Sequence, residues 1–198
     1  MAKLVLIRPG TTDFDEQGRI KGTLDIPLSA DGTEQVKKVA AEVAPLKIDY
    51  LYTSPCRCAE QTAAVVAART GLRPRVLEDL QNLDHGLWHG KLIDEVRLSQ
   101  PKVFRQMQEH PETVCPPEGE PCNEARTRAE RAVDKLLQKH RTGTVAVIIP
   151  EPLASLVQST LEKGVLGDLW KAQCAPAGWW LFEKNVPATS LWRGARGA

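Results

Sequence analysis

The chain has 198 residues, of which 42% are hydrophobic and 26% charged, and its mean hydropathy is −0.30. This composition excludes a disordered chain, a collagen-like fibre and a membrane bundle, and the length fits a single domain over residues 1–198. Twenty-six basic and 25 acidic side chains leave a net charge of +1, so no strong overall field would attract nucleic acid or an acidic membrane.

Cysteine usage and the start of the chain indicate the compartment. The five cysteines lack the paired spacing of a secreted disulfide framework, which predicts free thiols in a reducing environment. The first apolar run, Leu4–Ile7, is too short for the core of a signal peptide or for a membrane span. We therefore expect a cytoplasmic protein that binds neither a membrane nor nucleic acid.

Strands and helices are predicted to alternate along most of the chain. Apolar or β-branched runs predict strands at residues 4–7, 48–53, 75–77, 144–149 and 179–182. An amphipathic helix of about four turns is predicted after Ser29-Ala-Asp-Gly, with its apolar stripe at residues 36–44. Further helices are predicted at residues 60–68, 125–137 and 153–161, with one or two short helices between Trp88 and Glu120. The stretch from Thr11 to Pro27 has no such stripe and predicts a loop. This alternation favours one α/β domain whose parallel strands are joined by right-handed helical crossovers.

Several sequence blocks carry a family resemblance. Residues 6–12 read Leu-Ile-Arg-Pro-Gly-Thr-Thr, residues 52–63 read Tyr-Thr-Ser-Pro-Cys-Arg-Cys-Ala-Glu-Gln-Thr-Ala, residues 83–90 read Leu-Asp-His-Gly-Leu-Trp-His-Gly and residues 116–120 read Pro-Pro-Glu-Gly-Glu. They resemble, in this order, the Leu-Ile-Arg-His-Gly-Glu-Thr, Ser-Pro-x-x-Arg-x-x-Gln-Thr-Ala, Asp-Phe-Gly-x-Trp-Glu-Gly and Pro-Pro-Gly-Gly-Glu blocks of the histidine phosphatase (phosphoglycerate mutase-like) superfamily. Residues 18–29 resemble a further block of that family.

The resemblance implies a fold and a chemistry. The implied fold is a three-layer α/β/α sandwich with a mainly parallel central sheet. In the implied chemistry a neutral imidazole attacks phosphorus, arginines neutralise the phosphoryl oxygens, a second histidine adds positive charge, and a carboxylic acid protonates the leaving oxygen. No cofactor or metal ion is implied.

Three catalytic positions of the family pattern hold residues that cannot do this chemistry. The place of the nucleophilic histidine is Pro9, and the place of the second histidine is Pro150. The place of the acid is Asn82, whose amide cannot donate a proton at neutral pH. The sequence is therefore identified as a degenerate member that lacks both catalytic histidines.

Two arginines are expected to keep a binding role. Arg8 and Arg57 are interpreted as the family's phosphate-binding arginines, converging on a pocket for phosphate or a small phosphorylated ligand. The alternative is that carboxylates such as Asp15 or Glu151 pair with these arginines and no ligand binds.

Other chemistry-bearing residues allow further interpretations. His85 and His89 have an i,i+4 spacing that would suit a metal on a helix, but glycines interrupt the segment, and loop histidines with no metal are expected instead. Cys56 and Cys58 flank Arg57. A thiol beside an arginine can have a lowered pKa, although a packing role for both cysteines is the simpler expectation.

These observations predict a catalytically inactive histidine phosphatase-like protein, a pseudophosphatase that binds an anionic ligand or a protein partner. The alternative is a weak phosphomonoesterase that uses a substitute nucleophile in the same pocket. A third hypothesis is a structural or homo-oligomeric protein whose pocket is closed.

Overall fold

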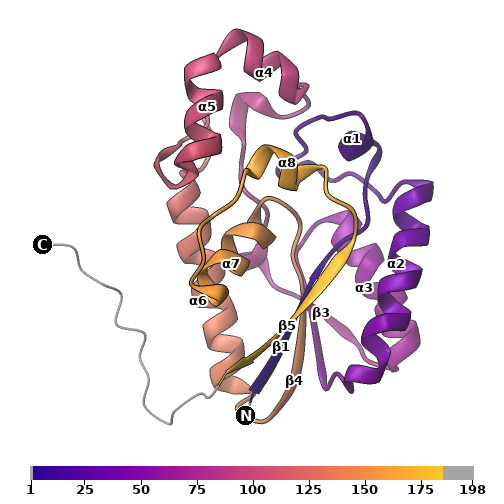
Figure 1. Ribbon diagram of the computed structural model, residues 1–198. Coiled ribbons are helices and arrows are strands. Elements are labelled where there is room, and N and C mark those ends of the chain that lie inside the picture. The colour runs from indigo at the N-terminus through magenta and orange to yellow at the C-terminus, as the bar shows by residue number, and fades with distance from the viewer. Residues whose placement is uncertain (1, 185–198) are drawn as a thin grey trace, which may run out of the picture.

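The computed structural model describes residues 2–184, in which a five-stranded sheet lies between two layers of helices (Figure 1). Its strands are β1 (Ala2–Arg8), β2 (Tyr50–Thr53), β3 (Pro74–Val76), β4 (Gly143–Ile148) and β5 (Gly178–Lys184), in the order β3-β2-β4-β1-β5. The first four are parallel, and β5 runs antiparallel to β1 at one edge. The predicted α/β fold with a mainly parallel sheet is confirmed.

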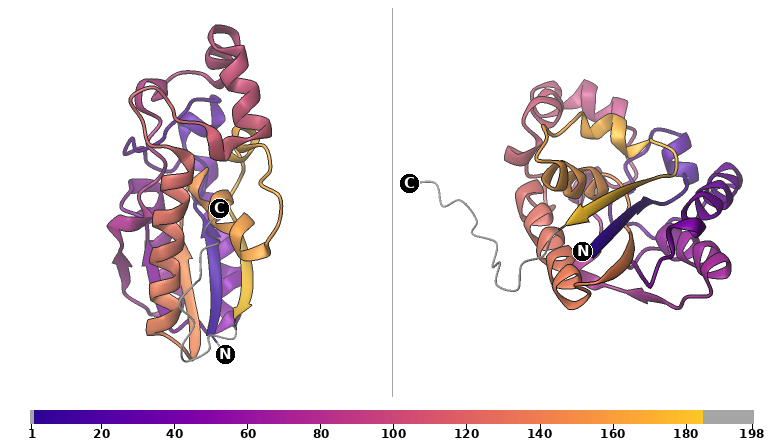
Figure 2. Two further views of the ribbon diagram at one scale, coloured as in Figure 1. Left: turned by 90° about the vertical axis from the view of Figure 1, so that its left-hand side faces the viewer. Right: turned by 60° about the horizontal axis from the view of Figure 1, so that its bottom comes forward.

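Alternation of side chains along the strands divides the core into two layers. Leu4 and Leu6 of β1 face α6 (Cys122–Lys139) and α7 (Leu153–Glu162). Val5 and Ile7 face α2 (Ala30–Val43) and α3 (Arg57–Thr70) on the opposite side. Both faces of a central parallel strand are thus apolar, which explains the continuous hydrophobic run at the start of the sequence. The two layers are visible on either side of the sheet in Figure 2.

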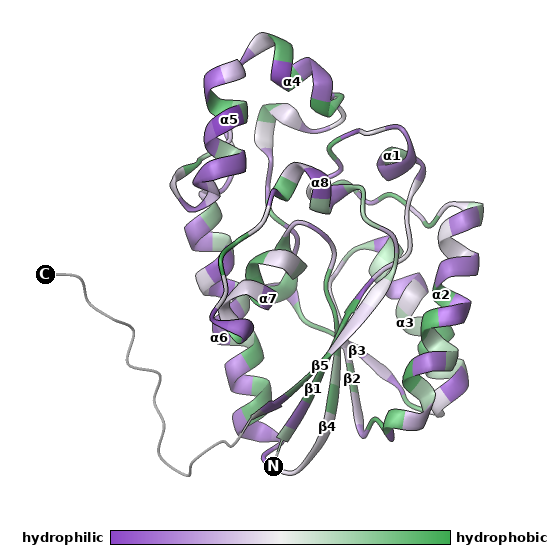
Figure 3. Cartoon of the chain, viewed as in Figure 1, coloured by the Kyte–Doolittle hydropathy of each residue, from purple (hydrophilic) through white to green (hydrophobic). Residues whose placement is uncertain are grey.

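Hydrophobic residues gather on the central strands, whereas the surrounding helices alternate between hydrophobic and hydrophilic stretches (Figure 3). This alternation places the apolar stripe of each long helix against the sheet. No helix within residues 2–184 is long and apolar enough to cross a membrane.

Short helices lie near the end of the sheet where β1, β2 and β4 terminate (Figure 1). These are α1 (Asp13–Glu16), α4 (Ile93–Ser99), α5 (Pro101–Glu109) and α8 (Leu169–Gln173). Single 3₁₀ turns occur at Ala44–Leu46, Glu78–Leu80, Gly86–Trp88 and Pro111–Thr113. The prediction that Thr11 to Pro27 is all loop is wrong at α1. This helix lacks an apolar stripe and is held by its N-cap, where the Thr12 hydroxyl accepts from the Asp15 backbone N–H.

The predicted domain covers residues 1–198, of which residues 1 and 185–198 lie outside the described part. Trp179 and Trp180 of β5 point to opposite faces, as their adjacent positions in a strand predict.

Candidate functional site

Three strand ends bring the sequence blocks together. Arg8 is the last residue of β1, Cys56 and Arg57 follow β2, and Glu151 follows β4. Because β1, β4 and β2 are neighbouring parallel strands, their carboxyl ends meet at one edge of the sheet. Open α/β sheets bind their ligands at this edge.

The cation at the end of β1 is already paired. Arg8 Nη1 donates to Glu151 Oε1 at 3.0 Å, and Arg8 Nε donates to the carbonyl oxygen of Pro176 at 2.6 Å. The guanidinium carbon lies 5.0 Å from the centre of the Trp180 ring, within cation–π range. The side chains of Arg8 and Glu151 are only 15% and 2% exposed, and Glu151 Oε2 also accepts the Ser155 backbone N–H at 3.1 Å. The Glu151 carboxylate therefore pairs with Arg8, as the alternative interpretation of the sequence expects.

Both proline positions are buried at strand ends. Pro9 follows β1 directly, and Pro150 lies two residues after β4. A proline side chain has neither a nucleophilic atom nor a titratable proton, and the residue has no backbone N–H to offer an oxyanion. The side chains at these two positions therefore supply neither a nucleophile nor a proton.

Asn82 connects the loops of Gly22 and Glu151 by hydrogen bonds. Its Nδ2 donates to the carbonyl oxygens of Gly22 at 3.0 Å and Glu151 at 2.8 Å. The side chain is buried, and Oδ1 accepts no hydrogen bond from any described residue. The amide at the acid's place thus holds the loop of Glu151 in position and supplies no proton.

A second buried ion pair connects α1 to the loop that follows it. Lys21 Nζ lies 2.7 Å from Asp15 Oδ1 and 2.6 Å from Asp15 Oδ2, and both side chains are buried. Asp15 Oδ2 also accepts from the Thr12 backbone N–H and hydroxyl, each at 2.8 Å. Burial alone would lower the pKa of Lys21, but the adjacent Asp15 carboxylate more than compensates, so this pKa is raised. Asp15 therefore pairs with a lysine and not with an arginine.

Arg57 takes no part in the charge pairs described for this site. Its side chain is exposed at the start of α3, and its guanidinium has no hydrogen bond or ion pair with another described residue. Only its backbone N–H is held, by Asp25 Oδ1 at 2.7 Å. In the Ser-Pro-x-x-Arg block the arginine is the third residue after proline, and the third residue after Pro55 is Cys58. Arg57 therefore lies one residue before the place of the arginine in that block.

Cys58 instead faces inward, with 2% exposure, and its Sγ lies 3.8 Å from that of Cys56. A hydrogen bond from the Cys56 thiol, helped by the charge of Lys21, lowers the pKa of Cys58 against the effect of burial. The same hydrogen bond, together with burial, raises the pKa of Cys56.

Of the two neighbouring histidines, His85 belongs to the buried interior and His89 is partly exposed. His85 is fully buried, and burial together with the neighbouring His89 lowers its pKa to about 4, so it is neutral at neutral pH. His89 Nε2 lies 3.2 Å from the backbone nitrogen of His85 and 3.3 Å from that of Thr23, and accepts from both. His85 lies outside the regular helices and strands, as expected of a loop histidine, and it is nevertheless fully buried. Residues 2–184 contain no group of three His, Cys, Asp or Glu side chains that could hold a metal ion.

A polar cavity of about 280 Å³ opens beside Asn82 and is lined by Thr23, Glu78, Gln81, Asn82, Asp84, Glu120 and Arg128. The one cation among these lining residues, Arg128, is paired with Glu120 at 2.7 Å and also donates to two backbone carbonyls. The excess of carboxylates disfavours a dianionic ligand at this opening.

Comparison with known proteins agrees with this architecture. The family model described as histidine phosphatase superfamily (branch 1) matches residues 4–186. Phosphoserine phosphatase 1 of Hydrogenobacter thermophilus is 31% identical over 148 residues, which are 75% of this chain and 70% of that protein. The curated relatives are covered to between 45% and 87% of their own length.

Two solved structures are similar in fold. YhfR of Bacillus stearothermophilus superposes with a TM-score of 0.78 at 26% identity, over 86% of this chain and 84% of that one. A mutant of phosphoserine phosphatase from Entamoeba histolytica, in complex with phosphoserine, has a TM-score of 0.78 at 23% identity, over 92% of this chain and 91% of that one.

Proposed function

The chain belongs to the histidine phosphatase superfamily, and we propose that it is a catalytically inactive member, a pseudophosphatase that acts by binding. The observation that carries the proposal is the replacement of the nucleophile, the second histidine and the acid by Pro9, Pro150 and Asn82. Members of a cooperating catalytic set act as a unit, so loss of one already removes most of the rate. Here three are replaced together.

The charges of the site favour a protein partner over a free phosphorylated ligand. Arg8 is neutralised by Glu151, and Lys21 by Asp15, both in buried pairs. An incoming phosphate would have to displace a carboxylate that is 2% exposed and hydrogen-bonded at both oxygens. Removing one partner from a buried ion pair costs roughly 3–5 kcal/mol. A protein surface that contacts the rim of the site carries no such cost.

The test is a sensitive assay for phosphomonoester hydrolysis with a generic aryl phosphate and with phosphoserine, the compound named for two of the similar proteins. We expect no turnover above that of an Arg8→Ala variant purified in parallel. Turnover that depends on Arg8 and reaches the ordinary enzymatic range, about 1 per second or more, would show that the protein is an enzyme. Calorimetry with the same phosphates then separates a ligand-binding pseudophosphatase from one that binds only proteins.

The enzymatic alternative has one supporting observation, the lowered pKa of Cys58 beside Lys21. A Cys58 thiolate that attacked phosphorus would form a phosphocysteine while the ester oxygen left and took a proton from water. Its 2% exposure opposes this route. A Cys58→Ala variant, compared with Cys115→Ala at an exposed thiol, should lose activity if the alternative holds.

A further inference from the structure

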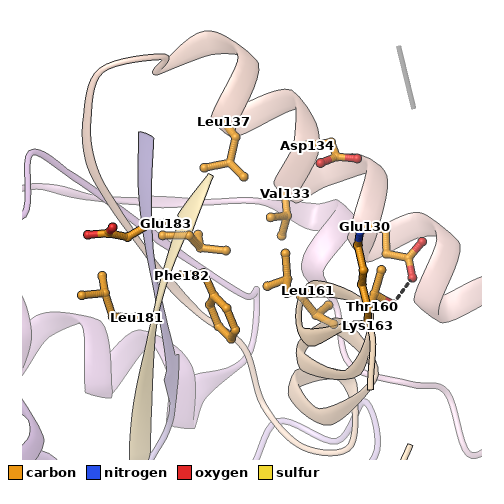
Figure 4. A pocket seen from close by; sticks show the side chains of 12 residues that line it. Glu130, Val133, Asp134, Leu137, Thr160, Leu161, Lys163, Leu181, Phe182 and Glu183 are labelled. Atoms are coloured by element: carbon orange, nitrogen blue, oxygen red, sulfur yellow. Dashed lines mark hydrogen bonds between the residues drawn. The ribbon is translucent and has the colours of Figure 1, made fainter. Parts of the chain in front are cut away.

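A second and larger cavity, of about 470 Å³, lies away from the edge of Arg8 and Glu151. It is a groove between α6, α7 and the end of β5, and we call it the α6–α7 groove (Figure 4). Its residues are Leu4, Glu130, Val133, Asp134, Leu137, Val157, Thr160, Leu161, Lys163, Leu181, Phe182 and Glu183.

The groove has an apolar floor and a predominantly acidic rim. Val133, Leu161 and Phe182 point toward one another across it in Figure 4. The rim carries three carboxylates and, among these lining residues, a single lysine, Lys163. An apolar hollow of this size in a folded protein is the usual form of a binding site for large hydrophobic side chains. The acidic rim selects an occupant with positive charge.

We propose that the α6–α7 groove is occupied by the C-terminal segment of the same chain, with Leu191 and Trp192 on the apolar floor and Arg193 and Arg196 on the acidic rim. Residues 185–198 include these two large apolar residues, two arginines and no acidic side chain. The segment therefore matches the groove in both polarity and charge.

The position of the segment supports the match. Glu183 lines the groove, and the described chain ends one residue later, at Lys184. The eight residues that follow Lys184, up to Trp192, span at most about 29 Å when extended. The groove runs along α6 from Glu130 to Leu137, which is roughly 10 Å of helix. The segment is therefore long enough to turn back and place Trp192 anywhere along it.

Glu183 can exchange its partner for a new cation. It pairs with Lys3 at 3.0 Å, with both side chains nearly half exposed, and an exposed pair of this kind contributes little stability. Glu130 is held more firmly, since it pairs with Arg126 at 3.5 Å and accepts the Thr160 hydroxyl at 2.5 Å. Arginine suits the replacement because its planar fork binds a carboxylate through two hydrogen bonds. Most of the affinity would come from burial of the leucine and the tryptophan.

The full-length protein labelled with 5-fluorotryptophan provides the test, because each tryptophan gives its own ¹⁹F resonance and a Trp192→Phe variant assigns the relevant one. We expect the Trp192 resonance to differ from that of an isolated peptide of residues 185–198 and to show a reduced H₂O/D₂O isotope shift. A Trp192 resonance identical in both respects to that of the free peptide would overturn the proposal.

Two variants connect this signal to the groove. Leu161→Glu, on the floor, should reduce the docked population of Trp192 about tenfold or more, whereas Leu98→Glu, at an exposed residue of α4, should leave it unchanged. Unchanged resonances of the four other tryptophans verify that the variant is folded. Arg193→Glu with Arg196→Glu should weaken docking without altering the groove itself. A Trp192 signal that moves on dilution, together with a dimeric elution volume, would refute docking within one chain and assign the groove to a second copy.

Discussion

Exchange of Glu151 for glutamine tests whether the protein's own carboxylate occupies the anion site. Glutamine has the same shape, and its amide oxygen can still accept from Arg8, so the loop after β4 should keep its fold. What changes is the charge. In the wild type, Arg8 Nη1 lies 3.0 Å from a Glu151 carboxylate that is 2% exposed. In the Glu151→Gln variant the guanidinium keeps its positive charge and loses its counterion.

The expected effect follows from the cost of separating that pair. An arginine site freed of its counterion should bind phosphate in the millimolar range, at about −4 kcal/mol. In the wild type the ligand must first displace Glu151, which costs roughly 3 kcal/mol or more for a buried pair. Since about 1.4 kcal/mol is a factor of ten, this cost weakens binding on the order of a hundredfold. We therefore expect a dissociation constant for phosphate of about 0.1 M in the wild type, which is weaker than that of the variant by a factor on the order of a hundred.

The assay is a phosphate titration followed by backbone amide NMR of both proteins. Shifts near Arg8 should saturate at millimolar phosphate in the variant, while the wild type changes little over that range. Glu162→Gln, at an exposed residue at the end of α7, is the matched control for loss of one carboxylate, and Glu151→Gln with Arg8→Ala should abolish the gain. Equal affinities of the wild type and Glu151→Gln would refute the idea that Glu151 competes with the ligand.

Three further predictions concern catalysis and the buried charges. Pro9→His alone should not produce phosphatase activity, because the second histidine and the acid remain replaced; turnover with aryl phosphate checks this. The pKa of about 4 for His85 lies below its ordinary value of 6.5, because burial disfavours the charged imidazolium. The stability contributed by the buried neutral imidazole is therefore complete above pH 6.5 and is lost as the pH falls from 6.5 through 4, by about 3 kcal/mol in all. Urea unfolding from pH 7 to pH 4 should show a shallower loss in His85→Gln than in the wild type, whereas His110→Gln, at an exposed histidine, should behave like the wild type. Lys21→Met should reduce the free energy of unfolding by roughly 3–5 kcal/mol by leaving Asp15 buried without a counterion, and adding Asp15→Asn should restore much of it; full stability of the single variant would contradict a buried pair.

The sequence was most informative about elements with strong periodicity. The buried run Leu4–Ile7 and the β-branched run at residues 144–149 correspond to β1 and β4, because central parallel strands are apolar on both faces. The stripes at residues 125–137 and 153–161 lie within α6 and at α7. The short helices α1 and α8 escaped prediction because capping side chains hold them, at Thr12 and Asp168, and not an apolar stripe.

Within the site, the sequence indicated where candidate residues lie along the chain better than it indicated which side chains pair with them. Both prolines and Asn82 could be assigned because Pro9 lies within a recognisable block, Asn82 directly precedes one, and Pro150 follows a β-branched run. The pairing of Arg8 with Glu151 was open as an alternative, since a carboxylate beside the helix that follows β4 was evident. The contact between Asp15 and Lys21 was not foreseeable, because both lie in a stretch with no periodic pattern to fix their side chains. Successive residues of a helix point about 100° apart, so an offset of one residue moved the expected side chain from the buried Cys58 to the exposed Arg57.

The proposed loss of the catalytic groups and the observed pairing of the cations are physically consistent with each other. A phosphatase site can leave cations poorly compensated because its substrate supplies the negative charge. Without such a substrate, the largely buried Arg8 and Lys21 would each impose a large desolvation cost. Glu151 and Asp15 remove that cost by placing carboxylates where they neutralise the cations permanently. A Pro9→His substitution would therefore add a nucleophile to a site in which Glu151 already neutralises Arg8. Phosphate could reach that histidine only after Glu151 had been displaced or replaced.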